Sequence, residues 1–120
     1  MSEEAEKLYQ QALLIREKTL GPEHPDTARS LNEIGELLTT QGKFEQSESI
    51  VKRALAIRKK IFGSNHADYA RSLSNLATLY FSMGKYHESE QLHNQCIAIL
   101  YKSLGATHPK LALRYNEKFL

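Results

Sequence analysis

The chain has 120 residues, of which 41% are hydrophobic and 25% charged, a composition typical of one soluble globular domain. Its apolar runs are short and its start, Met1-Ser2-Glu3-Glu4, lacks the basic residues of a signal peptide, so we expect no membrane contact and a cytoplasmic location. The net charge of +2 gives little attraction to nucleic acid, and the single cysteine, Cys96, excludes an internal disulfide.

The sequence repeats itself with a period of about 42 residues. Residues 12–53 match residues 54–95 at about 17 positions without a gap, and a weaker third copy starts at Cys96. A unit this short cannot bury its own apolar face, so successive copies must stack on one another. The repeat therefore predicts a stacked array that offers a binding surface, and it argues against an enzyme.

The first expected element is a helix over about residues 3–20. Its apolar side chains are spaced by three and four residues, which places them on one face of an α-helix. They are Ala5, Leu8, Tyr9, Ala12, Leu13 and Ile15. Because these positions align with the second helix of the next copy, we expect the chain to begin in mid-repeat, with a helix that lacks its partner.

Two full repeats, each a helix pair, are expected over residues 25–62 and 67–104. Pro25 suits a first helical turn, and Gly42 and Gly84 stand where a left-handed residue can end a helix. The second helices are expected to end at Gly63 and Gly105. The first helix of each pair carries an apolar stripe: Ala28, Leu31, Ile34, Gly35 and Leu38 in one copy, then Ala70, Leu73, Leu76, Ala77 and Tyr80.

Residues 109–120 are expected to hold a partial repeat, with only a first helix near residues 109–119. No segment shows the alternating pattern of a strand. A helix of about 17 residues is marginal alone in water, whereas burying one Leu or Ile contributes about 1.5–3 kcal/mol, so contacts between helices must supply the stability. We therefore predict one all-α domain over residues 1–120, with about five helices in antiparallel pairs.

Small side chains at Gly35, Ser47 and Ala54, set among larger ones, resemble the tetratricopeptide repeat, in which small residues let paired helices approach closely. The ordinary repeat has 34 residues, so the unit here is longer by about two helical turns. With the runs "LGPEHPDTA" and "ALLIREKTLG", the sequence is similar to the 42-residue subclass found in kinesin light chains and nephrocystin-3. The resemblance implies a right-handed α–α superhelical solenoid that binds protein partners and needs no cofactor.

By the family's pattern, the first helices line the concave face, and their residues outside the apolar stripe point into it. Such a face suits an extended partner peptide, because asparagine can bond to its main chain and arginine can pair with its carboxylates. These positions are Arg29, Asn32, Glu33, Glu36, Thr39, Arg71, Ser74, Asn75, Thr78, Phe81 and Asn116. The alternative is that they are ordinary wetted surface residues.

The chain departs from the kinesin light chain pattern in the proposed groove. Those proteins tend to carry paired asparagines, whereas this chain has Asn32-Glu33 in one copy and Ser74-Asn75 in the next. Glu33 and Glu36 would also repel the acidic peptides that kinesin light chains accept. The ligand class is therefore not carried over, and the coiled-coil heptads of a light chain are absent as well.

Other patterns that could carry chemistry favour structural roles. His24, His66 and His108 recur at the repeat period, which indicates capping or packing in the loop before each first helix. His93 and Cys96 could present two zinc ligands on one helix face, but structural zinc needs four and both positions align with core residues. We therefore predict neither a metal site nor a catalytic cysteine.

A basic run on the second helix of the first full repeat is interpreted as a solvated outer face, with no nucleic-acid site, because the domain is nearly neutral. It comprises Lys52, Arg53, Arg58, Lys59 and Lys60.

A second hypothesis is self-association. Terminal repeats normally need polar caps, and unpaired terminal helices would leave apolar faces open to another copy. The apolar residues of the last helix are Leu111, Leu113, Tyr115, Phe119 and Leu120. A homo-oligomer through the terminal helices is thus the alternative to a module that binds a partner peptide.

Overall fold

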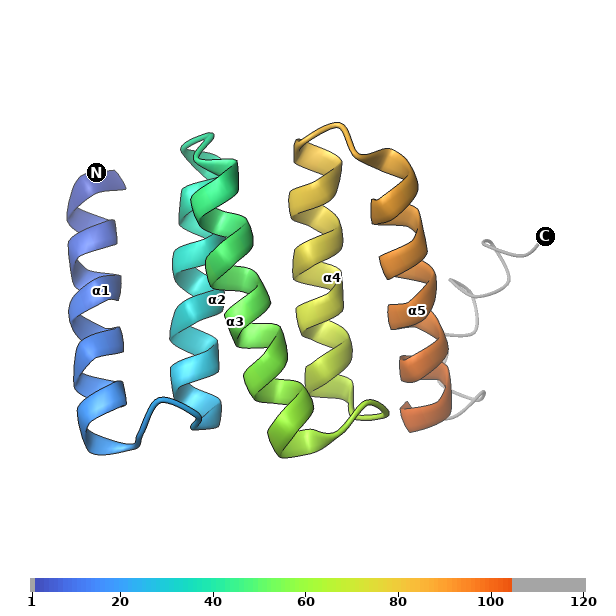
Figure 1. Ribbon diagram of the computed structural model, residues 1–120, viewed down its shortest axis with the longest axis horizontal. Helices are drawn as coiled ribbons and strands as arrows, with labels where there is room; N and C mark the ends of the chain where they lie inside the picture. Colours follow the sequence, from blue (N-terminus) through green and yellow to red (C-terminus); the bar gives the residue numbers. More distant parts are fainter. Residues whose placement is uncertain (1, 105–120) are drawn as a thin grey trace.

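The computed structural model describes residues 2–104, which form five α-helices and no strand (Figure 1). Each helix packs against the next along the chain, so the helices follow one another across the molecule in antiparallel order. This arrangement confirms the predicted all-α solenoid. The expected helix near residues 109–119, with His108 and Asn116, lies outside the described residues. The helices are α1 (Ser2–Thr19), α2 (Pro25–Thr40), α3 (Phe44–Phe62), α4 (Ala67–Ser82) and α5 (Tyr86–Leu104).

Histidines cap the N-termini of α2 and α4. The Nδ1 atom of His24 accepts a hydrogen bond from the backbone N–H of Asp26 at 3.1 Å, and His66 accepts from Asp68 at 3.0 Å. Each bond satisfies a backbone N–H that has no partner within the helix. Pro25 begins α2, where a missing N–H costs nothing. The structural role predicted for these two histidines is confirmed.

Glycines with positive φ end α2 and α4, at Gly42 (φ 78°) and Gly84 (φ 80°). At the first of these turns, the N–H of Lys43 donates to the carbonyl of Leu38 at 2.9 Å. This backbone conformation is strained for other residues, which explains why both copies have glycine there.

Small residues allow α2 and α3 to approach closely, as predicted. A Cβ added to Gly35 would lie 2.5 Å from Cγ2 of Val51, so no side chain fits between the two helices at this point. The hydroxyl of Ser47 donates to the carbonyl of Gly35 at 2.7 Å, and Ser89 donates to Ala77 in the next pair at the same distance. The repeated contact fixes the pairing of the helices in both copies.

The predicted apolar stripes form the core, with three differences. Tyr80 is only half-buried, because its hydroxyl donates to Glu48 of α3 at 2.7 Å, and Leu79 is buried in its place. On α1, Leu8 and Ile15 are 64% and 62% exposed, although they align with core positions of α3. The reason is that among the described helices only α2 packs closely against α1, apart from an ion pair between Glu17 and Arg53 of α3, whereas α3 lies between α2 and α4.

Four of the five residues in the basic run on α3 are exposed, as the sequence indicated, and Arg58 is the exception. Arg58 is half-buried, and its Nη1 donates to Ser72 Oγ at 3.2 Å and to the carbonyl of Asp68 at 3.4 Å. Arg16 of α1 makes the equivalent bonds to Ser30 and Asp26. These arginines join each second helix to the first turn of the following repeat. Other members of the run form ion pairs: Lys52 with Glu48, Arg53 with Glu17 and Lys60 with Glu23.

Candidate functional site

The first helices of the two repeats, α2 and α4, contact each other and line one face of the solenoid. Three adjoining hollows lie along this face, and we call them together the groove. The N-terminal hollow has a volume of about 310 Å³ and the C-terminal hollow about 440 Å³, and they share Glu36 and Asn75. The lateral hollow, of about 570 Å³, shares Ser74 with the first.

Three arginines from three helices line the N-terminal hollow: Arg29 of α2, Arg58 of α3 and Arg71 of α4. Arg29 pairs with Asp26 at 3.7 Å and Arg71 with Asp68 at 3.3 Å, both in exposed pairs of the kind that contribute little energy. Burial lowers the pKa of Arg58; Asp68 opposes this effect, while Arg71 and Arg29 add to it. The three guanidinium groups therefore share one positive field.

Asn32 lies at the floor of the N-terminal hollow, with its side chain almost wholly buried. It is 6% exposed, and neither Oδ1 nor Nδ2 has a hydrogen-bond partner. The sequence predicted an open position on the concave face for Asn32, but the approach of the neighbouring helices buries it. Ser74, at the same place in the next repeat, is only half-buried. Buried polar groups without partners are rare in folded proteins, which marks this amide as a candidate for ligand contact.

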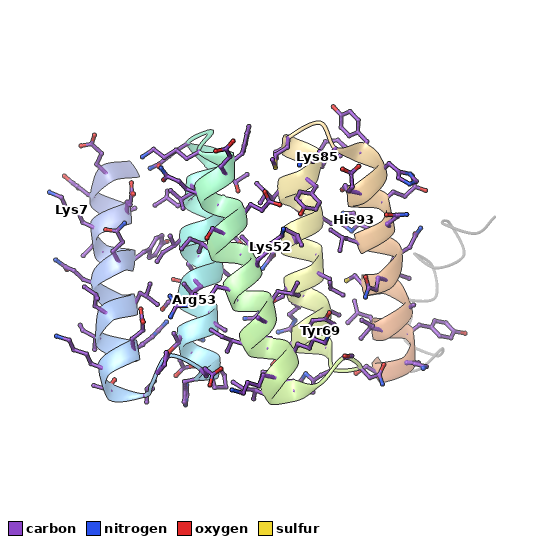
Figure 2. All side chains as sticks on the ribbon, viewed as in Figure 1. Lys7, Lys52, Arg53, Tyr69, Lys85 and His93 are labelled. Carbon is purple, nitrogen blue, oxygen red and sulfur yellow. The ribbon has the colours of Figure 1, made fainter. Side chains whose placement is uncertain are left out.

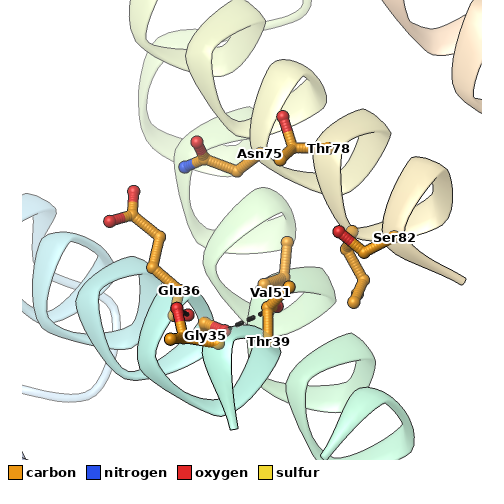
Figure 3. A pocket seen from close by; sticks show the side chains of 9 residues that line it. Gly35, Glu36, Thr39, Val51, Asn75, Thr78 and Ser82 are labelled. Atoms are coloured by element: carbon orange, nitrogen blue, oxygen red, sulfur yellow. Dashed lines mark hydrogen bonds between the residues drawn. The ribbon is translucent and has the colours of Figure 1, made fainter. Parts of the chain in front are cut away.

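The C-terminal hollow is lined by polar groups from two helices over an apolar floor. Figure 3 shows Glu36 and Thr39 of α2 opposite Asn75, Thr78 and Ser82 of α4, with Val51 of α3 beneath them. The hydroxyl of Thr39 donates to the carbonyl of Gly35 at 2.9 Å, and that of Thr78 to Ser74 at 3.0 Å. The Thr78 hydroxyl therefore serves its own helix, and that of Thr39 also bonds to the hydroxyl of Ser47 on α3 at 2.8 Å. Glu36 and Asn75, by contrast, extend into the space between α2 and α4 (Figure 3).

The lateral hollow lies along α4 and α5 and carries exposed aromatic rings. Phe81 and Tyr86 are 62% and 61% exposed, and their ring centroids lie 5.0 Å apart in an edge-to-face arrangement. His93, which lies between α4 and α5 in Figure 2, and Cys96 line the same hollow.

Within residues 2–104 there is no group of three His, Cys, Asp or Glu side chains placed to hold a metal ion. None of the described helices is long and apolar enough to cross a membrane.

A family model described as Tetratricopeptide repeat matches the chain at residues 2–60, 31–102 and 68–117. The chain belongs to the tetratricopeptide repeat family. Proteins built from tetratricopeptide repeats generally act as scaffolds for protein–protein interaction. A comparison with curated proteins finds no significant match.

Solved structures place this tetratricopeptide repeat domain with those of the kinesin light chain kind. A putative kinesin light chain from Podosopora anserina with nearly identical TPR-like repeats is 30% identical in sequence to this chain and superposes with a TM-score of 0.78. The match covers 92% of this chain and 52% of that one. BtubC (BKLC) from P. vanneervenii shares 26% identity with a TM-score of 0.76, over 82% of this chain and 39% of that one. The chain thus spans about half the length of these relatives or less.

In this tetratricopeptide repeat domain, ten of the predicted site residues line the groove. The N-terminal hollow brings together Arg29, Asn32, Glu33, Arg71 and Ser74, and Glu36 and Asn75 connect it with Thr39 and Thr78 in the C-terminal hollow; Phe81 stands apart from them in the lateral hollow.

Asn116 lies outside the described residues. Arg58, Ser82 and Tyr86 are among the lining residues that were not predicted from the sequence. For Arg58 a signal was present, because arginine also stands at position 16, one repeat period earlier.

Proposed function

We propose that the groove along α2 and α4 binds an extended segment of a partner protein. The observation that carries this proposal is the gathering of ten predicted residues around three adjoining hollows. A segment lying there would meet side-chain amides for its main chain, guanidinium groups for its carboxylates and aromatic rings for an apolar side chain. The proposed role is recognition without a cofactor or a chemical step, in the cytoplasm.

Selection from a displayed library of random peptides, followed by affinity measurement with labelled peptides, tests this proposal. Replacing Arg29 and Arg71 together by alanine should weaken binding about tenfold or more, because both charge-assisted contacts are lost. Helical melting should be unchanged, since both side chains are exposed. The matched control replaces Lys59 and Lys102, two exposed cations away from the groove, and should bind normally. Equal affinity of the groove variant and the control would rule out the groove.

Self-association through α1 is the second candidate. Leu8 and Ile15, seven residues apart and so on one face of α1, are both mostly exposed. The partner we propose for this face is a second copy of the chain, since equivalent residues of α3 are covered by neighbouring helices. Figure 2 shows Lys7, on the same helix, pointing away from the rest of the molecule.

Analytical ultracentrifugation of the wild type and of a Leu8→Ser, Ile15→Ser variant tests the second candidate. We expect dimers that dissociate in the variant, because the exposed apolar surface is removed. A wild-type monomer across a hundredfold concentration range would exclude self-association by this face.

A further inference from the structure

The N-terminal hollow holds opposite charges that do not neutralise one another. Arg58 takes part in none of the ion pairs formed within the described part of the chain, and neither do Glu33 and Glu36. All three line the same hollow. A ligand that carries both a carboxylate and a cation would therefore find a partner for each charge.

The spacing of these charges along α2 matches that of an extended peptide. Arg29 and Glu33 are one helical turn apart, which corresponds to about 6 Å along the helix axis. In a strand, side chains two residues apart point to the same face and are separated by about 6.6–6.8 Å. In a bound extended peptide, an acidic side chain that contacts the arginines and a basic side chain that contacts Glu33 would thus be two residues apart.

Asn32 supplies the contact between these charges. Its amide offers a donor and an acceptor, both buried and both without partners. A residue in an extended segment presents its N–H and C=O on one edge, so one asparagine can bond to both. Its position on α2, between Arg29 and Glu33, places the amide beside the main chain of the residue that separates the two charged ones.

We propose that the N-terminal hollow selects an extended segment with an acidic and a basic side chain two residues apart, and that Asn32 binds the main chain between them. This inference rests on the proposed function and narrows its ligand. A purely acidic segment is disfavoured, because its second carboxylate would meet Glu33 and Glu36. The arginines disfavour a purely basic segment for the same reason.

Arrays of short peptides with acetylated and amidated ends test this inference. The central residues are Asp-X-Lys or Lys-X-Asp, which cover both directions of the segment, and the flanks are random. Matched arrays carry Asp-X-Asp or Lys-X-Lys. At least one mixed-charge array should bind about fivefold or more above both matched arrays, because each uniform array loses one opposite-charge contact and gains a repulsion.

Variants identify which residue reads each charge. Glu33→Lys should shift the preference from the mixed-charge peptides to Asp-X-Asp, whereas Glu4→Lys, the same change on the exposed surface of α1, should leave it unaltered. Asn32→Leu should weaken all peptides about tenfold or more, whatever their charges, because it removes a main-chain contact.

The outcomes separate this inference from the proposed function. If peptides bind, and the Arg29 and Arg71 double variant loses them, but mixed-charge arrays show no advantage, the charge rule is wrong and the groove stands. A preference that Glu33→Lys leaves unchanged would also overturn the inference. Failure of every array, together with failure of the random library, would instead overturn the proposed function.

Discussion

Replacing Asn32 by leucine should stabilise the protein while it weakens peptide binding. Asn32 is 6% exposed, and its two polar side-chain atoms lack partners. A buried polar group without a hydrogen bond costs about 1–3 kcal/mol. Leucine is similar in volume and needs no partner, so the change removes this cost without opening a cavity.

The expected gain in the free energy of unfolding is about 1–2 kcal/mol, the lower part of the range, because the amide borders a hollow that water can reach. The higher helix propensity of leucine adds a few tenths of a kcal/mol. A gain of 1 kcal/mol should raise the melting temperature by roughly 4 °C. Urea denaturation followed by circular dichroism measures the first quantity, and a thermal scan the second.

The matched control is Asn75→Leu, which gains the same helix propensity at a half-buried position whose amide is not among the unpartnered buried groups. We expect it to change the free energy of unfolding by less than about 0.5 kcal/mol. If Asn32→Leu destabilises the protein by 1 kcal/mol or more while the control is neutral, the amide is satisfied in the free protein and the reasoning fails.

Three further changes test the packing and the electrostatics by urea denaturation. Gly35→Ala should lower the free energy of unfolding by about 1 kcal/mol, since the clash with Val51 outweighs the gain in helix propensity. Val51→Ala removes the clashing methyl group, so Gly35→Ala should cost less in the Val51→Ala background; an equal cost in both backgrounds would contradict the clash. Arg58→Met should lower the free energy of unfolding by about 1–3 kcal/mol, because two hydrogen bonds between α3 and α4 are lost. An unchanged free energy of unfolding would show that the guanidinium does not stabilise the fold. The hydrogen bond from Tyr80 is the largest cause that lowers the pKa of Glu48. The stabilisation by this bond is therefore present above the ordinary glutamate pKa and lost as pH falls through the lower pKa of the folded state. Tyr80→Phe should thus destabilise the protein more at pH 7 than at pH 3, and an effect independent of pH would refute this.

The period and the small residues were enough to predict the fold. Positions that recur in both copies carry the packing: Gly35 and Ser47 set the distance between paired helices, and His24 and His66 cap the first helices. These are local interactions or contacts between adjacent helices, so the sequence of a single repeat already encodes them.

The groove was predictable as a set of positions but not as a geometry. The sequence could not reveal that Asn32 is buried, because its burial depends on how closely neighbouring helices approach. Arg58 was misread for a related reason: a charge in a basic run is usually solvated, but here its long stem crosses to α4. The exposure of Leu8 likewise follows from which helices surround α1 and not from its own pattern.

Whether the groove holds a peptide main chain through Asn32 can be seen in the side-chain amide signals of Asn32 in a nitrogen–proton correlation spectrum, when a peptide selected by the protein is added. We expect these two signals to shift and to gain protection from exchange with water, in step with the signals of Asn75. A peptide that binds, shifts signals elsewhere and leaves those of Asn32 unchanged would contradict it.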